Sequence, residues 1–273
     1  MVDIDLNSTL IRRCAPFGTL ILALNSLTVS AHEFWLEPER FAAPEGTTVG
    51  FEIRIGQYFS GRNYPYIDRE TEAFIKRTDS GIEPIKAVTG DKPAVTLELE
   101  GRATWVAYTS NDFNIRFRDT EKFTNYLKDE GLEWVFEWYK EQGKSLKDAT
   151  ESYYRHAKAL SWSGPDEPEW LSEPLGMRIE LVPDSGFLRC SELARFRALY
   201  QGEPLEGHLV RRFRKGTEEV QEFRADADGY VEFPAGEGPF LLNVVHIEDA
   251  SNPRAKGKDW ISDWASLTYT CAN

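Results

Sequence analysis

The sequence predicts a mainly β protein made of two β-sandwich domains, the first of which carries a helical insertion. Three patterns support this: short alternating runs broken by turns up to about Val106, helical spacing in the middle, and strand after strand from Met177 on. The aromatic content of 13% favours strands and a well-filled core. The predicted divisions are a signal peptide at 1–31, an N-terminal β domain at 32–175 with the insertion at about 120–160, and a C-terminal β-sandwich at 176–273.

Residues 1–31 have the pattern of a secretory signal peptide. Arg12 and Arg13 precede an apolar run, and Val29-Ser30-Ala31 offers a cleavage site. The apolar run is shorter than the roughly 20 residues that a spanning helix needs, which disfavours the alternative of a transmembrane anchor. We therefore expect a periplasmic protein that has no membrane insertion after cleavage and begins at His32.

The N-terminal domain is expected to open with short strands. Residues 49–55 alternate apolar and polar side chains, as a half-buried strand does. The runs 94–99 and 103–108 show much the same alternation. Glu100-Gly101 separates them, which predicts a hairpin.

After Thr120 the spacing of the apolar residues changes to that of helices. Three helices are predicted from apolar residues at helical spacing: Phe123, Tyr126 and Leu127; Trp134, Trp138 and Tyr139; Tyr153, His156, Ala157 and Leu160. Gly131 is the expected end of the first helix. This block is the predicted insertion.

The C-terminal domain is expected to hold short strands separated by turns. Asp226-Ala227-Asp228-Gly229 resembles half of a calcium loop, but Asp-Gly between two alternating runs favours a hairpin turn. The predicted strands are 178–182, 193–200, 208–213, 220–224, 230–233, 240–247 and 264–270.

Charge and cysteine content limit the partners and the compartment. The chain has 45 Asp+Glu against 32 Lys+Arg, a formal charge of -13, so nucleic acid and anionic membranes are unfavourable partners. Cleavage would leave Cys190 and Cys271, which an oxidising compartment would join in a disulfide; two buried free thiols are the alternative.

The sequence carries no enzyme motif of the common classes. HExxH, GxSxG, a P-loop and GxGxxG after a strand are all absent, so we expect a protein that is not an enzyme. Four tryptophans could form a stacking platform for sugars, although aromatics at helical spacing are more often core: Trp134, Trp138, Trp162 and Trp170.

Several segments resemble one family of secreted bacterial proteins described as the periplasmic component of nickel/cobalt uptake. The resemblance is carried by 32–38 (HEFWLEP), 123–127, 154–160, 226–229 and 264–268. It implies a soluble metal-binding protein whose partners are the metal ion and a membrane transporter. The C-terminal half also resembles immunoglobulin-like or transthyretin-like modules of secreted bacterial proteins.

Three histidines are the candidate metal ligands: His32, His246 and His156. As the mature N-terminus, His32 would offer its α-amine and imidazole Nδ1 to one ion, and such nitrogen donors suit nickel, cobalt, copper or zinc. His246 ends an apolar strand, where a core histidine is the alternative. His156 has the cations Arg155 and Lys158 beside it, which disfavour a bound cation.

His208 lies near the basic run 211–215 and is interpreted as a surface residue. Glu33 and Asp263 could add oxygen ligands, but their spacing in the sequence does not match a metal-binding motif. The leading function is metal binding for nickel or cobalt uptake. The alternatives are an envelope module that binds a protein or glycan through the Trp-rich insertion, and a copper metalloenzyme that uses His32.

Overall fold

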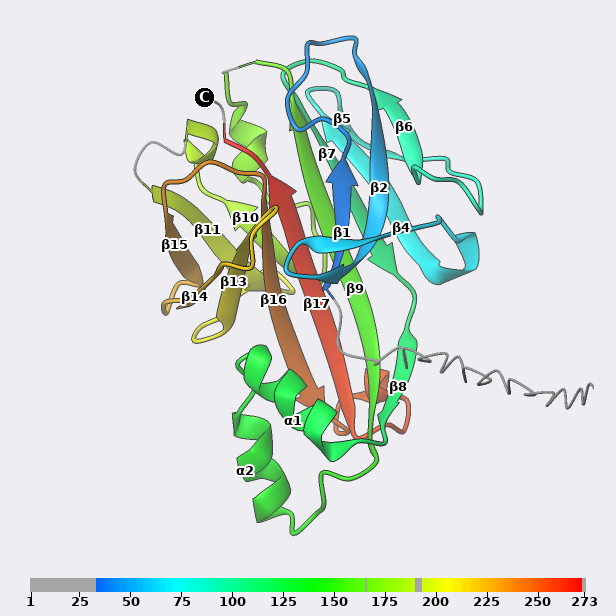
Figure 1. Ribbon diagram of the computed structural model, residues 1–273, viewed down its shortest axis with the longest axis vertical. Helices are drawn as coiled ribbons and strands as arrows, with labels where there is room; N and C mark the ends of the chain where they lie inside the picture. Colours follow the sequence, from blue (N-terminus) through cyan, green and yellow to red (C-terminus); the bar gives the residue numbers. More distant parts are fainter. Residues whose placement is uncertain (1–32, 165, 190–192, 272–273) are drawn as a thin grey trace, which may run out of the picture.

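The computed structural model describes residues 33–164, 166–189 and 193–271. Over these residues the strands form three sheets, and the chain also forms two α-helices (Figure 1). The prediction of a mainly β fold is confirmed, and the stacked sheets are consistent with a β-sandwich.

Two smaller sheets come from opposite ends of the chain. The first contains β1 (Glu33–Pro38), β2 (Thr48–Gln57) and β3 (Ser60–Tyr64), with β6 (Val95–Glu98) also paired to β2. The second contains β10 (Ile179–Pro183), β11 (Leu193–Tyr200) and β12 (Glu203–Pro204), with β15 (Tyr230–Pro234) also paired to β11.

The large sheet draws its strands from both halves of the described chain. Its order is β14 (Val220–Arg224), β13 (Leu209–Arg214), β16 (Phe240–Asp249), β17 (Trp260–Tyr269), β9 (Ala149–Trp162), β7 (Ala103–Ser110), β4 (Thr71–Thr78) and β5 (Gly81–Pro84), and β8 (Phe113–Phe117) also pairs with β9. At the centre, β17 runs parallel to β9, so one sheet continues across the predicted boundary at 175/176. The two-domain division stays a prediction.

The large sheet is covered on both faces, which follows from the alternation of side chains along its strands. In β16, Leu242 and Val244 face a core shared with the β10–β11–β12–β15 sheet. Val245 and Ile247 face the other way, into a core shared with the two helices. The β1–β2–β3–β6 sheet packs on this second face farther along, as Figure 1 shows.

Two of the three predicted helices are confirmed. Helix α1 (Thr120–Asp129) is capped by the Asp119 carboxylate, which accepts from the Glu121 amide, and ends at Gly131 with a left-handed φ of 70°. Helix α2 is Trp134–Glu141.

The third predicted helix, which included His156, is wrong, because residues 149–162 form β9. Both faces of this strand are buried: Ala157 and Ala159 lie in one core and Leu160 in the other. A strand buried on both faces lacks the apolar–polar alternation, and its apolar residues happened to match helical spacing.

The predicted hairpin between 94–99 and 103–108 is also wrong. Both runs are strands, but β6 pairs with β2 while β7 pairs with β4 and β9. Strands next to each other in sequence thus go to different sheets. Within the described residues, none of the helices has the length and apolar character needed to cross a bilayer.

Candidate functional site

Polar side chains gather at one end of the core between the large sheet and the β10–β11–β12–β15 sheet. His246 on β16 and Asp263 on β17 are cross-strand partners, and His156 reaches Asp263 from β9. Tyr200, at the end of β11, reaches the same group from the smaller sheet. The alternation of side chains places the three strand residues on one face of the sheet.

Asp263 is the fixed charge of this group and is 1% exposed. Arg254 donates to both of its carboxylate oxygens at 2.8 Å, and the His156 ring Nε2 lies 3.1 Å away. Burial alone would raise the pKa of Asp263, but the hydrogen bonds from His156 and Arg254 outweigh it and hold the pKa at about 2. Asp263 is therefore ionised at neutral pH.

His156 has a partner at each ring nitrogen. Nε2 faces Asp263, and Nδ1 lies 3.3 Å from the Thr109 hydroxyl. The ring is 3% exposed. A metal ion could bind His156 only by displacing one of these partners.

Tyr200 connects Asp263 to His246. Its hydroxyl donates to the Glu248 carboxylate at 2.7 Å, accepts from Arg254 at 3.1 Å and lies 3.3 Å from Asp263. The Tyr200 ring also contacts the His246 ring, with centroids 4.1 Å apart. Burial, followed by the hydrogen bond to Glu248, raises the pKa of Tyr200 to about 12.

His246 and His208 form a pair that the sequence analysis missed. Nε2 of His208 lies 2.9 Å from Nδ1 of His246, and both rings are half-buried. Val210 pairs with Val244 in the antiparallel register. His208 lies two residues before Val210 and His246 two residues after Val244, so the two histidines meet on the same face of the sheet. His208, interpreted from the sequence as a surface residue, is half-buried, and its pairing with His246 could not be predicted without knowing which strands pair.

Each ring also has an acceptor at its outer nitrogen. Nδ1 of His208 lies 3.1 Å from the carbonyl oxygen of Glu206, so this nitrogen carries the proton. Nε2 of His246 lies 3.4 Å from the Glu248 carboxylate, which also favours a proton there. With these protons in place, both facing nitrogens of the neutral rings are left as acceptors.

A 2.9 Å contact between two ring nitrogens is satisfied by a proton, as an N–H···N hydrogen bond, or by a metal ion on which both lone pairs converge. Burial lowers the pKa of His208, and burial and then the charge of His208 lower the pKa of His246. The cationic form of each ring is thus disfavoured, and neutral imidazole is the form that binds metals.

The other face of the sheet holds a separate acidic cluster. Glu130 accepts from Arg211 and Asn243, each at 2.9 Å, and Glu33 lies 3.8 Å from Arg211. Asn243 and His246 are an odd number of residues apart on β16, so their side chains point to opposite faces of the sheet. Glu33 shares Arg211 with Glu130, the partner of Asn243, and therefore lies on the opposite face from His246. Asp263 thus joins the histidine network and Glu33 does not.

Some predicted site residues lie outside the described residues: His32, the signal peptide and Cys190. The Cys190–Cys271 disulfide and ligation by His32 stay predictions. Cys271 is 8% exposed in the core between the large sheet and the β10–β11–β12–β15 sheet. Within the described ranges, no group of three or more His, Cys, Asp or Glu side chains is arranged to hold a metal ion.

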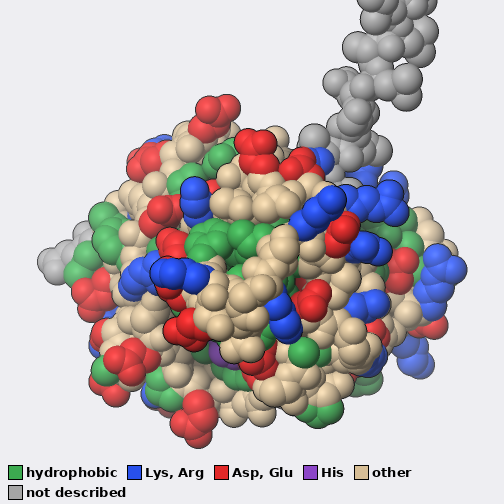
Figure 2. All heavy atoms as spheres, turned by 90° about the horizontal axis from the view of Figure 1, so that it is seen from below, with side chains coloured by type: hydrophobic (Ala, Val, Ile, Leu, Met, Phe, Trp, Pro, Cys, Tyr) green, Lys and Arg blue, Asp and Glu red, His purple; other side chains and the backbone are tan. Residues whose placement is uncertain are grey.

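The four tryptophans proposed as a platform lie in two places. Trp134 and Trp138 are on α2, where both rings contact Trp260. Trp162 and Trp170 pack against the core under the β10–β11–β12–β15 sheet. Figure 2 shows acidic and basic side chains interspersed over the end of the molecule seen from below, with a histidine among them.

Comparisons with known proteins name no function. A family model described as "Domain of unknown function (DUF4198)" matches residues 29–248. Among solved structures, a mutant of Salmonella alpha-2-macroglobulin is similar at 11% sequence identity and a TM-score of 0.21, over 88% of this chain and 15% of that chain. A TM-score this low carries no argument. No curated protein matches the chain.

Proposed function

Because the chain belongs to the DUF4198 family, a domain of unknown function, its activity must be argued from its own site, and we propose that it binds a divalent transition-metal ion between His208 and His246. The observation behind the proposal is the 2.9 Å approach of two ring nitrogens whose outer partners are both acceptors. Carboxylates and carbonyls that orient the outer N–H of a histidine are typical of metal ligands.

The spacing of the two nitrogens also favours particular metals. With metal–nitrogen bonds of about 2.0–2.1 Å, nitrogens 2.9 Å apart subtend about 90° at an ion. That angle suits square-planar or octahedral coordination better than the tetrahedral arrangement of zinc. We therefore propose nickel, cobalt or copper ahead of zinc.

Two histidine ligands leave positions open for water or a further donor. Such a site supports reversible binding, as a carrier needs, and the resemblance to secreted nickel/cobalt uptake proteins supports nickel or cobalt as cargo in the periplasm. His32 and His156 remain candidates for the open positions, and each can be tested by its own variant.

The test is metal retention by natively processed protein whose N-terminus has been confirmed. Metal-free protein is loaded with Ni²⁺, Co²⁺, Cu²⁺ or Zn²⁺, desalted and measured by elemental mass spectrometry. We expect near-stoichiometric metal in the wild type and binding weakened at least about 10-fold in His208→Gln and His246→Gln. His156→Gln tests the predicted third ligand separately, and Glu141→Gln, which removes an exposed carboxylate on α2, is the control.

Retention that is equal in the wild type and in both histidine variants would contradict the proposed site. Absence of metal from the wild type after loading would contradict metal binding itself. It would favour the alternative function, binding of a protein or glycan through the Trp-rich helices. Loss of metal in His32→Ala alone would move the site to the N-terminus.

A further inference from the structure

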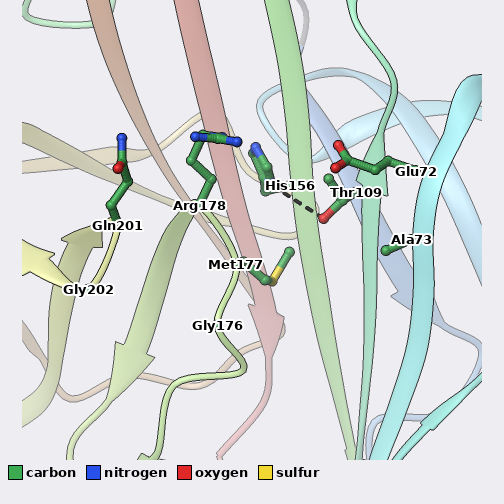
Figure 3. A pocket seen from close by; sticks show the side chains of 9 residues that line it. All are labelled: Glu72, Ala73, Thr109, His156, Gly176, Met177, Arg178, Gln201 and Gly202. Carbon is green, nitrogen blue, oxygen red and sulfur yellow. Dashed lines mark hydrogen bonds between the residues drawn. The ribbon is translucent and has the colours of Figure 1, made fainter.

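An open cavity of about 520 Å³ has His156 in its lining (Figure 3). Its volume is in the range of small-molecule sites. One wall comes from the large sheet and the other from turns of the β10–β11–β12–β15 sheet. The lining residues used below are Glu72, Thr109, His156, Arg178 and Gln201.

Two opposite charges face this cavity without a partner. Among the described residues, the Arg178 guanidinium and the Glu72 carboxylate make no ion pair or side-chain hydrogen bond. Figure 3 shows them on either side of His156, so they do not neutralise each other.

Two further polar side chains of the lining, His156 and Gln201, belong to ordered parts of the structure. His156 is fixed between Asp263 and Thr109. Gln201 has a left-handed φ of 54° in the two-residue turn between Tyr200 and Glu203, a position that favours Asn or Gly. The glutamine brings an amide to the cavity wall from that strained backbone.

We propose that this cavity binds a small zwitterion, a free amino acid or a short peptide. Its carboxylate would lie on Arg178, whose planar guanidinium binds carboxylates with two parallel hydrogen bonds. Its ammonium group would lie on Glu72. A simple anion would be repelled by Glu72 and a simple cation by Arg178, so the pair selects ligands that carry both charges. Binding does not require the metal.

Isothermal titration calorimetry on metal-free protein tests the proposal. The probes are glycine, L-leucine and glycylglycine, with acetate and methylammonium as half-ligands. We expect at least one zwitterion to bind at least 10-fold more tightly than either half-ligand. Comparison of the amino acids with the dipeptide distinguishes the two sources of the ligand.

Two variants and two matched controls locate the binding. Arg178→Gln and Glu72→Gln should each weaken it at least 10-fold. Arg118→Gln and Glu141→Gln, which remove exposed charges elsewhere, should leave it unchanged. His208→Gln should also retain it, which separates this site from the metal site.

Failure of all three zwitterions to bind the wild-type protein would overturn the proposal. Equal binding by the wild type, Arg178→Gln and Glu72→Gln would overturn it too, because the ligand would then lie elsewhere. Circular dichroism of each variant shows whether a loss of binding reflects a loss of fold.

Discussion

Carboxylates are buried on both faces of the large sheet, and their partners determine their charge. Asp263 has Arg254 and a pKa of about 2. Glu151 accepts from the Ser262 and Tyr126 hydroxyls, both at one of its oxygens, and no cation pairs with it among the described residues. Burial dominates there and raises the pKa of Glu151 to about 7, although these hydrogen bonds lower it. Similar burial thus leaves Asp263 ionised at pH 7 and Glu151 about half protonated.

The raised pKa of Glu151 predicts a pH-dependent stability. Between an unfolded value near 4.5 and the folded value of about 7, the native state binds more protons, so this group lowers stability as pH rises through that window. Glu151→Gln removes the ionisation. The stability of the variant relative to the wild type should therefore increase from pH 5 to pH 8, by on the order of 3 kcal/mol.

Urea unfolding of metal-free protein at the two pH values measures this difference. Glu121→Gln, which changes an exposed carboxylate, is the control and should show little pH-dependent change. A Glu151→Gln difference that is the same at both pH values would show that the carboxylate keeps one protonation state throughout.

At the scale of elements, α2 is attached to the large sheet through aromatic rings. The Trp260 indole of β17 donates to the Tyr139 hydroxyl at 2.9 Å, and the Trp138 ring lies 4.8 Å from the Trp260 ring. Trp134 touches the same indole edge-on but is 48% exposed. Trp260, which is fully buried, should therefore carry most of the stability of this contact.

Replacement of each tryptophan with alanine tests how the stability of the contact is divided between Trp260 and Trp134. Trp260→Ala should cost about 3–5 kcal/mol, the usual result of emptying a large buried site. Trp134→Ala should cost no more than about 1.5 kcal/mol, the value of a single aromatic pair. Chemical denaturation gives both values, and equal costs would contradict the assignment of Trp134 to the surface.

At the scale of the whole molecule, the two halves of the chain share one sheet and are joined by buried ion pairs. Beside the β9–β17 pairing, the Lys158 ammonium donates to the Glu180 carboxylate at 2.7 Å, and both side chains are only 2% exposed. The pair crosses the predicted boundary at 175/176. Removal of either half would leave a buried charge and an open strand edge.

We therefore expect the halves to fold together. Residues 32–175 and 176–273, produced separately, should each lack the dispersed amide NMR spectrum of the full 32–273 chain. That chain should unfold in a single transition by circular dichroism and fluorescence. A dispersed spectrum for 176–273 alone would instead support an independent C-terminal β-sandwich.

Local patterns in the sequence predicted most strands and two helices, because alternation, helical spacing and breakers such as Gly131 act over a few residues. They failed where a strand is buried on both faces, as at 149–162. The same limit applies to the site: His246 and His156 could be selected as chemically able residues, but no local signal marked His208 or Tyr200.

The sequence by itself determined the mainly β class, the acidic charge and the set of residues able to bind a metal or a ligand. Only the tertiary structure decided which strands are neighbours, since hydrogen bonding between strands joins residues far apart and alternation does not specify the partner. Through that pairing His208 meets His246, Asp263 meets Arg254 and His156, and Arg178 and Glu72 come to face one cavity.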